Sequence, residues 1–594
     1  MITSFSSLVR FPTAAAVVTA AFLAIGGSIF AQTPTPTPPP VYSRILIFGD
    51  SLSDVGNLRH RMQEKGISYP GGDFNYSDGR FTNSSDTKPA STAFVGVWHE
   101  QLARTFLNKA ASTPSLDGGD DFAFGGATTE DGTRDYTLIN GSIFGNVTVT
   151  IDNIGKQVDD YVTRRTIDPN ALFVVWGGGN DLFDNDSPSN VTATAARVAM
   201  NVSRLANAGA RYFLVPNVPP LGGVPRYSDD GVAQAAKNRA SSDYRAQLNA
   251  NLDSTISTLT SQGKQIQVGR LDIWSLFVRF VANPGAYGIT DFLHSAQGQS
   301  VNPDKYLFWD DIHPTTAAHY QIANEANRVL TGAVQPPARA VNLASRVSVG
   351  AGEKVAVGGF IVTGPDSKRV VLRGIGPSLQ SRGIAGALPN PTIELFNSAN
   401  TSVVVNDDWK DSPQAAEIAA TGLAPTNDRE SAVLQTLTPG SYTVRMSAKD
   451  GVPGIGVVEI YDVGASANSN LANLSTRGFV GNNDDVLIGG VIIDNGGAPI
   501  TVVRAIGPTL MSAGIAAPLL DPTLTLYDNN GTQLGVNDDW RQGQPTAAKA
   551  TLLAPGDDRE SVIVASLPAG NYTAVVRGKN GATGVALVEV YRIP

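Results

Sequence analysis

Short, nearly continuous apolar runs alternate with amphipathic helical patterns in the first half of the chain. The runs cover residues 44–48, 171–176 and 212–215, and each has the length and composition of a strand buried on both faces. Helical patterns cover residues 93–106, 195–208 and 233–259, and a stripe of Ala318, Ile322, Ala326 and Leu330 predicts a last helix over 316–330. This alternation predicts a parallel sheet covered by helices on both faces.

The pattern changes near residue 335, and beyond that point the chain repeats itself. The segment Asn-Asp-Asp-Trp at 406–409 returns at 537–540, and Asp-Arg-Glu-Ser at 428–431 returns at 558–561, so the period is 131 and then 130 residues. This period is far longer than a solenoid unit. Runs of Val, Ile, Leu, Thr and Tyr between Gly, Asn, Asp and Pro turns predict strands. We therefore expect two consecutive all-β sandwich domains, over 340–464 and 470–594.

The N-terminus has the pattern of a secretory signal peptide. Arg10 precedes an apolar run over residues 14–25 and a stretch of small residues that ends at Ala31, which predicts a signal peptide over 1–31. The alternative is a retained membrane anchor, because the apolar run borders on the length of a short span. Residues 32–40 are rich in Thr and Pro and predict an extended linker. The α/β domain is then expected over 41–335, in a chain secreted to the cell exterior, the cell surface or the periplasm.

The composition argues against a nucleic-acid partner and excludes chemistry that depends on cysteine. The chain has 594 residues, 42% hydrophobic and 16% charged, as expected for several globular domains. Its formal net charge is −9, and it lacks the basic footprint that a nucleic-acid partner requires. The sequence contains no cysteine, which excludes disulfides, thiolate metal sites and cysteine nucleophiles.

Ser51 is the first candidate for catalytic chemistry. It lies in Gly49-Asp50-Ser51-Leu52, directly after the first apolar run, where open α/β sheets place their ligands. Taken alone, this segment also fits a turn that caps a helix. A serine nucleophile requires a base within hydrogen-bond reach and an acid that orients the base.

His313 is the candidate base. It ends the segment Asp310-Asp311-Ile312-His313, in which a carboxylate three residues earlier can turn onto the imidazole and leave the other ring nitrogen for the serine. Asp311 lacks this spacing. The alternative is a capping turn with solvated acids. His319, inside the following helix, is expected to be a packed or surface residue.

Two glycine-rich segments offer donors for a developing oxyanion. Asn180 follows three glycines at the end of the second apolar run and can present its side-chain amide. Residues 121–128 contain Gly125 and Gly126, where the missing side chain lets a backbone N–H approach a substrate. Glycine is also common in ordinary βα turns, so the two segments gain meaning only together with Ser51 and His313.

In this order, the four segments resemble the hallmark blocks of the GDSL family of SGNH hydrolases, over residues 41–330. The resemblance implies a flavodoxin-like three-layer α/β/α sandwich with a parallel sheet, and no metal or organic cofactor. It also implies Ser51 as nucleophile, Asp310 and His313 as its partners, and an oxyanion hole of the Ser51 and Gly126 N–H groups and the Asn180 amide, with Gly125 as the second choice.

These observations predict a secreted serine esterase or lipase that hydrolyses carboxylic esters through an acyl-serine intermediate. Its substrate would be a lipid, a small ester or an acetylated glycan. A carbohydrate O-acetylesterase is the enzymatic alternative. The alternative outside enzymes is a surface-binding or adhesion protein with an inactive hydrolase-like domain. The two β domains resemble paired modules of secreted bacterial proteins and would fit contact with a cell surface or a polysaccharide.

The repeated Asn-Asp-Asp-Trp segments have two interpretations. They could form Ca²⁺ loops with an exposed tryptophan that stacks on sugars. The interpretation we favour is an Asx-rich turn whose tryptophan, Trp409 or Trp540, folds into the core.

Overall fold

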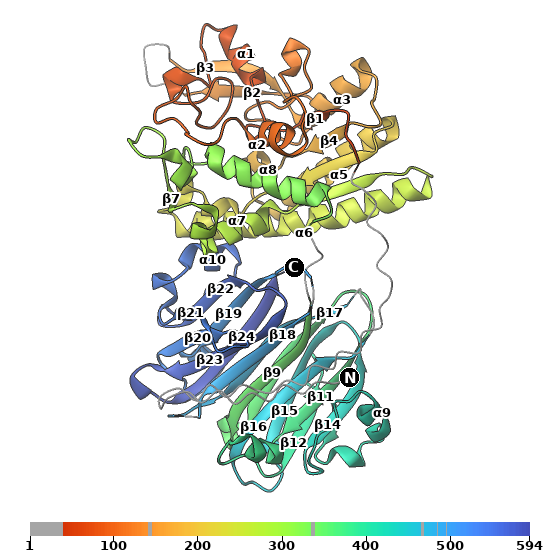
Figure 1. The fold of residues 1–594 in the computed structure, drawn as a ribbon, viewed down its shortest axis with the longest axis vertical. Helices are drawn as coiled ribbons and strands as arrows, with labels where there is room; N and C mark the ends of the chain where they lie inside the picture. Colours follow the sequence, from red (N-terminus) through yellow and green to blue (C-terminus); the bar gives the residue numbers. More distant parts are fainter. Residues whose placement is uncertain are drawn as a thin grey trace. The chain divides into compact units, whose positions relative to one another are not determined.

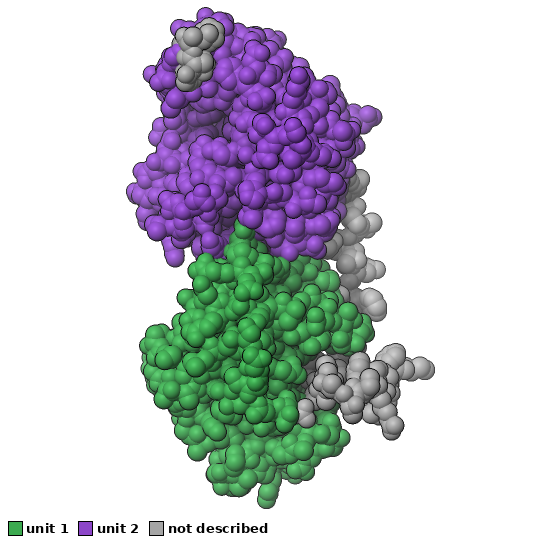
Figure 2. All heavy atoms as spheres, turned by 90° about the vertical axis from the view of Figure 1, so that its left-hand side faces the viewer, with its two compact units in different colours: residues 1–34, 336–548, 553–594 green, residues 35–335, 549–552 purple. Residues whose placement is uncertain are grey.

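The structure, a computed structural model, describes residues 40–139, 145–333, 339–464, 469–483, 485–494 and 496–593. They form two compact units, coloured separately in Figure 2. The predicted signal peptide and all but the last residue of the predicted linker lie outside the described residues. Within those residues, no helix combines the length and the apolar character needed to cross a membrane.

A four-stranded parallel sheet (Figure 1) organises the α/β unit, which Figure 2 colours purple as unit 2. Its order is β1 (Ile45–Phe48), β4 (Leu172–Val175), β5 (Tyr212–Pro216) and β6 (Gln267–Leu271). The first three strands are those that the apolar runs predict, and every residue of β1 and β4 is buried. Strand β6 was not predicted, because this edge strand pairs only with β5 and carries no continuous apolar run.

Helices cover both faces of this sheet, which confirms the predicted three-layer α/β/α fold. Phe48, Phe173 and Val215 share one buried cluster with α3 (Ile154–Arg164), α5 (Pro188–Ala208) and α6 (Gly231–Ser261). Helix α8 (Thr316–Leu330) covers the other face. An added Cβ at Gly269 of β6 would lie 2.9 Å from Val329 of α8 and 3.3 Å from Leu214 of β5. The unit also contains α1 (Asn57–Gln63), α2 (Trp98–Gln101), α4 (Gly179–Asp184), α7 (Ile273–Ala282), hairpin β2 (Thr133–Leu138) and β3 (Val147–Asp152), and paired strands β7 (Asp291–Ser295) and β8 (Tyr306–Phe308).

The β unit, which Figure 2 colours green as unit 1, contains both copies of the repeat and is all-β apart from short helical segments, as predicted. The first copy supplies β9 (Ala340–Val349), β10 (Ala356–Thr363), β11 (Lys368–Ile375), β12 (Pro391–Phe396), β13 (Ser402–Asn406), β14 (Ser431–Leu437), β15 (Gly440–Ala448) and β16 (Gly454–Asp462). The second supplies β17 (Asn470–Val480), β18 (Leu487–Ile493), β19 (Ile500–Ile506), β20 (Pro522–Tyr527), β21 (Gln533–Asn537), β22 (Ser561–Ser566), β23 (Gly570–Gly578) and β24 (Gly584–Ile593).

The two copies interlock instead of forming two separate sandwich domains. Strand β10 of the first copy pairs antiparallel with β17 of the second, and β18 of the second pairs antiparallel with β9 of the first. One hydrophobic cluster contains core residues of both copies, among them Leu343, Leu372, Leu474 and Val588. The predicted boundary between residues 464 and 470 is therefore not a boundary between two cores. Strand patterning predicts which segments are strands, but it does not specify their partners.

The structure also bears on the two interpretations of the Asn-Asp-Asp-Trp segments. In the second copy, carboxylate oxygens of Asp521, Asp538 and Asp539 lie within 4.8 Å of one another. The Lys579 ammonium is 2.6 Å from Asp538 and at most 4.0 Å from the other two, so it offsets part of the negative charge of this cluster. Trp540 is buried. This arrangement is a charge-paired turn that packs a tryptophan, as we favoured.

In the first copy, the equivalent turn has the same design. Lys449 pairs with Asp407 and lies 3.9 Å from Asp408. Trp409 is partly buried and packs against a small cluster that contains Ile418. The tryptophan therefore contributes to packing in both copies, although Trp409 is less completely covered than Trp540.

Candidate active site

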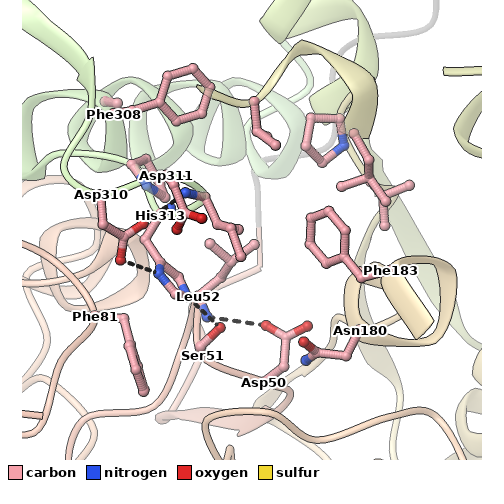
Figure 3. A pocket seen from close by; sticks show the side chains of 18 of the residues that line it. Asp50, Ser51, Leu52, Phe81, Asn180, Phe183, Phe308, Asp310, Asp311 and His313 are labelled. Carbon is pink, nitrogen blue, oxygen red and sulfur yellow. Dashed lines mark hydrogen bonds and ion pairs between the residues drawn. The ribbon is translucent and has the colours of Figure 1, made fainter. Parts of the chain in front are cut away.

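Ser51 lies in a tight turn at the carboxyl end of β1. The Asp50 carbonyl accepts the N–H groups of Ser53 and Asp54, each at 3.0 Å, and the Asp50 carboxylate accepts the N–H of Leu52, also at 3.0 Å. These bonds bend the chain sharply after the strand, and the Ser51 hydroxyl lines a cavity (Figure 3). The position is the one that the sequence predicts.

The structure brings His313 and Asp310 to this serine. The His313 Nε2 atom lies 2.8 Å from Ser51 Oγ, and its Nδ1 atom lies 2.6 Å from Asp310 Oδ2. The other oxygen, Asp310 Oδ1, accepts the N–H groups of Ile312 and His313 at 2.7 and 2.6 Å. The three-residue spacing thus forms the predicted loop, in which the Asp310 carboxylate contacts Nδ1 of the imidazole and leaves Nε2 for Ser51.

Asp310 remains ionised in spite of its burial. Burial alone would raise the pKa of this carboxyl group, but the adjacent His313 and the hydrogen bonds that Asp310 accepts lower its pKa to about 2. A carboxylate of this kind can stabilise positive charge on the imidazole throughout the neutral pH range.

The other two candidates in this region lie outside the hydrogen-bonded series. The Asp311 carboxylate turns to Arg226, 2.9 Å away, and is half exposed. His319 is fully buried, and its Nδ1 accepts the N–H of Trp98 at 3.2 Å. Burial lowers the pKa of His319 to about 3, so this ring stays neutral and packs in the core. Both findings agree with the sequence-based expectation.

Asn180 lies in the first turn of α4, and its side-chain amide faces the cavity (Figure 3). One amide hydrogen is used, because Asn180 Nδ2 donates to the Ala127 carbonyl at 2.8 Å. The bond fixes the side chain and leaves the second amide hydrogen for a ligand in the cavity.

The structure distinguishes between the two candidate glycines. The Gly125 N–H donates to Asp54 Oδ2 at 2.8 Å and is therefore committed to the protein interior. Gly126 lines the cavity, and its N–H has no acceptor among the described residues. Its φ is +84°, and an added Cβ would lie 2.5 Å from the Tyr136 ring, so this position requires glycine. Gly126 is the residue placed to donate a backbone hydrogen bond to a ligand.

The cavity has a volume of about 320 Å³ and is mostly apolar beyond the polar residues at Ser51. Helices α7 and α8, strand β8 and the loop after β5 supply its walls. Representative lining residues are Leu221, Leu276, Phe277, Phe280, Phe308 and Ile322. The sequence does not predict this cavity, because its walls come from elements distant along the chain.

The sequence pattern also did not predict a role for three polar or aromatic residues of the site. Asp50 is buried beside Ser51, and burial raises its pKa to about 6. The Tyr76 hydroxyl donates to Asp310 Oδ2 at 2.6 Å. Phe81 stacks on the His313 ring with centroids 4.8 Å apart. Tyr76 and Phe81 lie in a loop-rich stretch without periodicity, so the sequence carried no signal for them.

A serine, a histidine and a carboxylate in hydrogen-bonded series, beside two unused N–H donors, define the serine hydrolase class. Residues 45–326 match the family described as GDSL-like Lipase/Acylhydrolase, so this part of the chain is similar to members of that family.

Curated relatives match the same half of the chain. Similar proteins include the Phosphatidylcholine-sterol acyltransferase of Aeromonas hydrophila, 24% identical over 338 residues that cover 48% of this chain and 90% of that protein. Esterase EstA of Pseudomonas aeruginosa is 29% identical over 334 residues, 49% of this chain and 47% of the relative. An uncharacterized protein of Pseudomonas putida is 26% identical, over 49% of each chain. The chain thus spans about half the length of these two Pseudomonas relatives.

Among solved structures, a member of the lipolytic protein G-D-S-L family from Veillonella parvula covers 48% of this chain and 95% of its own. Its sequence identity is 12% and its TM-score is 0.24.

Proposed function

We propose that the α/β unit is a serine esterase that hydrolyses carboxylic esters through an acyl-Ser51 intermediate. The observation that carries this proposal is the continuous series from Ser51 Oγ to His313 Nε2, at 2.8 Å, and from His313 Nδ1 to Asp310, at 2.6 Å. Such a series makes a weak nucleophile reactive, because the base accepts the hydroxyl proton as the oxygen attacks.

In the proposed reaction, Ser51 Oγ attacks the ester carbonyl while His313 Nε2 takes its proton. Asp310 stabilises the imidazolium that forms. The negative charge on the former carbonyl oxygen is met by the Ser51 and Gly126 N–H groups and the free amide hydrogen of Asn180. His313 then gives its proton to the leaving alcohol. Water, activated by the same imidazole, hydrolyses the acyl-serine and restores the hydroxyl.

The cavity supports an aliphatic acyl group longer than acetyl as the substrate. Its apolar walls begin beside Ser51 and continue along α7 and α8, so a hydrocarbon chain attached to the reacting carbonyl would be removed from water. An acetyl group would leave most of this volume unused. This favours a lipase-like carboxylesterase over the carbohydrate O-acetylesterase, although both would use the same catalytic residues.

Acyl-chain dependence tests this choice. For p-nitrophenyl esters, we expect kcat/KM to rise at least about tenfold from acetate to octanoate, because each buried methylene contributes up to about 0.8 kcal/mol. Ala318→Leu, which adds volume to the cavity wall, should lower the octanoate-to-acetate ratio. Acetylated xylan as the best substrate, or a ratio that does not depend on Ala318, would contradict the acyl-cavity assignment.

We also propose that the chain is exported and that its β unit contacts a cell surface or a polysaccharide. The order of Arg10, the apolar run over 14–25 and the small residues before Ala31 supports export. N-terminal sequencing of the protein expressed from the full chain should give Gln32 as the first residue. A cytoplasmic protein that begins at Met1 would overturn the proposal.

A further inference from the structure

Tyr76 makes a contact with the catalytic carboxylate that the proposed mechanism leaves unexplained. Its hydroxyl donates to Asp310 Oδ2 at 2.6 Å, the same oxygen that accepts His313 Nδ1 at 2.6 Å. Asp310 Oδ1 is already occupied by two backbone N–H groups. The phenol and the imidazole therefore share one carboxylate oxygen, and each limits how much negative charge the other receives.

The loop that carries Tyr76 is fastened to the loop that carries Asp310. Trp309 Nε1 donates to the Asn75 carbonyl at 2.8 Å. On the other side of the loop that carries Asp310 and His313, the Thr316 N–H donates to Asn83 Oδ1 at 2.9 Å, and Asn83 Nδ2 donates to the Thr316 hydroxyl at 3.1 Å. Because residues 75 and 83 are tied to residues 309 and 316, the Tyr76 hydroxyl cannot drift from the carboxylate without breaking several other bonds.

Aromatic packing fixes the direction of the Tyr76 ring. Its centroid lies 5.5 Å from that of Phe81 and 5.9 Å from that of Tyr69, both in edge-to-face geometry. Phe81 in turn stacks on the His313 imidazole. Burial and the nearby Asp310 raise the pKa of Tyr76 above its ordinary value, so the phenol keeps the proton that it donates to Asp310.

We propose that Tyr76 is a positioning residue that sets the proton affinity of the Asp310–His313 pair; this inference rests on the proposed esterase function. By donating to Asp310, the phenol weakens the hold of the carboxylate on the imidazolium. His313 then loses its proton at a lower pH and is available as a base over a wider range. Removal of the hydroxyl should strengthen the hold of Asp310 on the imidazolium and raise the pKa of His313.

Other titratable groups face the pair and must be considered in any pH profile. They are Asp50 in the turn after β1, Tyr69, Tyr136 on β2, His319 on α8, and the Arg226–Asp311 ion pair that lines the cavity. Burial raises the pKa of both tyrosines and lowers that of His319 to about 3, so these three stay neutral near pH 7. Asp50, with a pKa of about 6, is present in every variant below, so a comparison between variants removes its contribution.

The test is the pH profile of kcat/KM for Tyr76→Phe. We expect its acid limb to move to higher pH by several tenths of a unit to about one unit. Tyr69→Phe is the matched control. It removes a hydroxyl from the same ring cluster, one that accepts from Tyr136 at 3.2 Å and makes no hydrogen bond to Asp310, so its acid limb should move clearly less than that of Tyr76→Phe. A purely structural role of Tyr76 would lower the rate equally at all pH values.

A second measurement does not need activity. In the Ser51→Ala protein, NMR titration of the His313 ring should show a higher pKa with Phe than with Tyr at position 76. If Tyr76→Phe fails to fold, 3-fluorotyrosine at position 76 keeps the ring, strengthens the donor and should move both readouts to lower pH. An inactive wild-type protein with the NMR shift would refute the esterase function alone. Unchanged pH limb and unchanged NMR titration would overturn the role of Tyr76.

Discussion

Ser51→Ala will lower kcat for p-nitrophenyl ester hydrolysis by about 10⁴-fold to 10⁶-fold. The substitution removes the atom that would carry the proposed acyl intermediate and leaves the cavity and the proposed oxyanion donors in place. His313→Ala should cost a similar factor, because without the base the hydroxyl is a weak nucleophile. The double variant should be little worse than either single variant, since the two residues act as one unit.

His294→Ala is a matched control for this experiment. His294 Nδ1 lies 3.0 Å from the carboxylate of Asp291, three residues earlier in the sequence, but its side chain is 70% exposed. We expect its kcat to match that of the wild type. Labelling by a fluorophosphonate probe should disappear in Ser51→Ala and persist in His294→Ala. Undiminished hydrolysis by Ser51→Ala would remove Ser51 from the mechanism, whereas loss of activity in His294→Ala would show that the test is not specific to the site.

The two Asp-x-x-His segments also show what sequence spacing does and does not determine. In both, the carboxylate contacts the imidazole three residues later. Only His313 also lies beside a serine hydroxyl and within a mostly buried site, with its side chain 12% exposed. The spacing therefore predicts the local pair, while the place of the loop in the fold decides whether the pair can act on a nucleophile.

The elements that the sequence predicted are those dominated by local pattern. Buried strands β1, β4 and β5 and helix α8 follow from uninterrupted apolar runs or a clear apolar stripe. Ser51, Asn180 and Gly126 follow from their place directly after strands or in glycine-rich turns. In each case, the information lies within about ten residues.

What the sequence did not predict depends on contacts between distant segments. Tyr76 meets Asp310 across 234 positions, and nothing around Tyr76 distinguishes it from other loop tyrosines. The cavity beside Ser51 is assembled from several elements at once. In the β unit, β9 and β17 pair with strands of the opposite copy as well as with strands of their own, an exchange that a repeat period of this kind does not reveal.

Asn180→Ala should lower kcat by about 10²-fold to 10³-fold and change KM little. The structure gives the reason. The side chain is held by the bond from Nδ2 to the Ala127 carbonyl, 2.8 Å long, so its second amide hydrogen is already oriented when the substrate arrives. That hydrogen gains most when the carbonyl oxygen becomes negatively charged, and an interaction that strengthens in the transition state appears in kcat. Asn207→Ala, at an exposed asparagine in α5, controls for the loss of an amide elsewhere.

The kinetic outcome separates two roles of Asn180. If it only bound the ester before reaction, Asn180→Ala would raise KM and leave kcat intact. If it only stabilised the turn at the start of α4, the variant would lose thermal stability, and its remaining folded fraction would have the wild-type kcat. A lower kcat at unchanged KM and unchanged Tm assigns the amide to the oxyanion, together with the Gly126 N–H that the geometry leaves without an acceptor among the described residues.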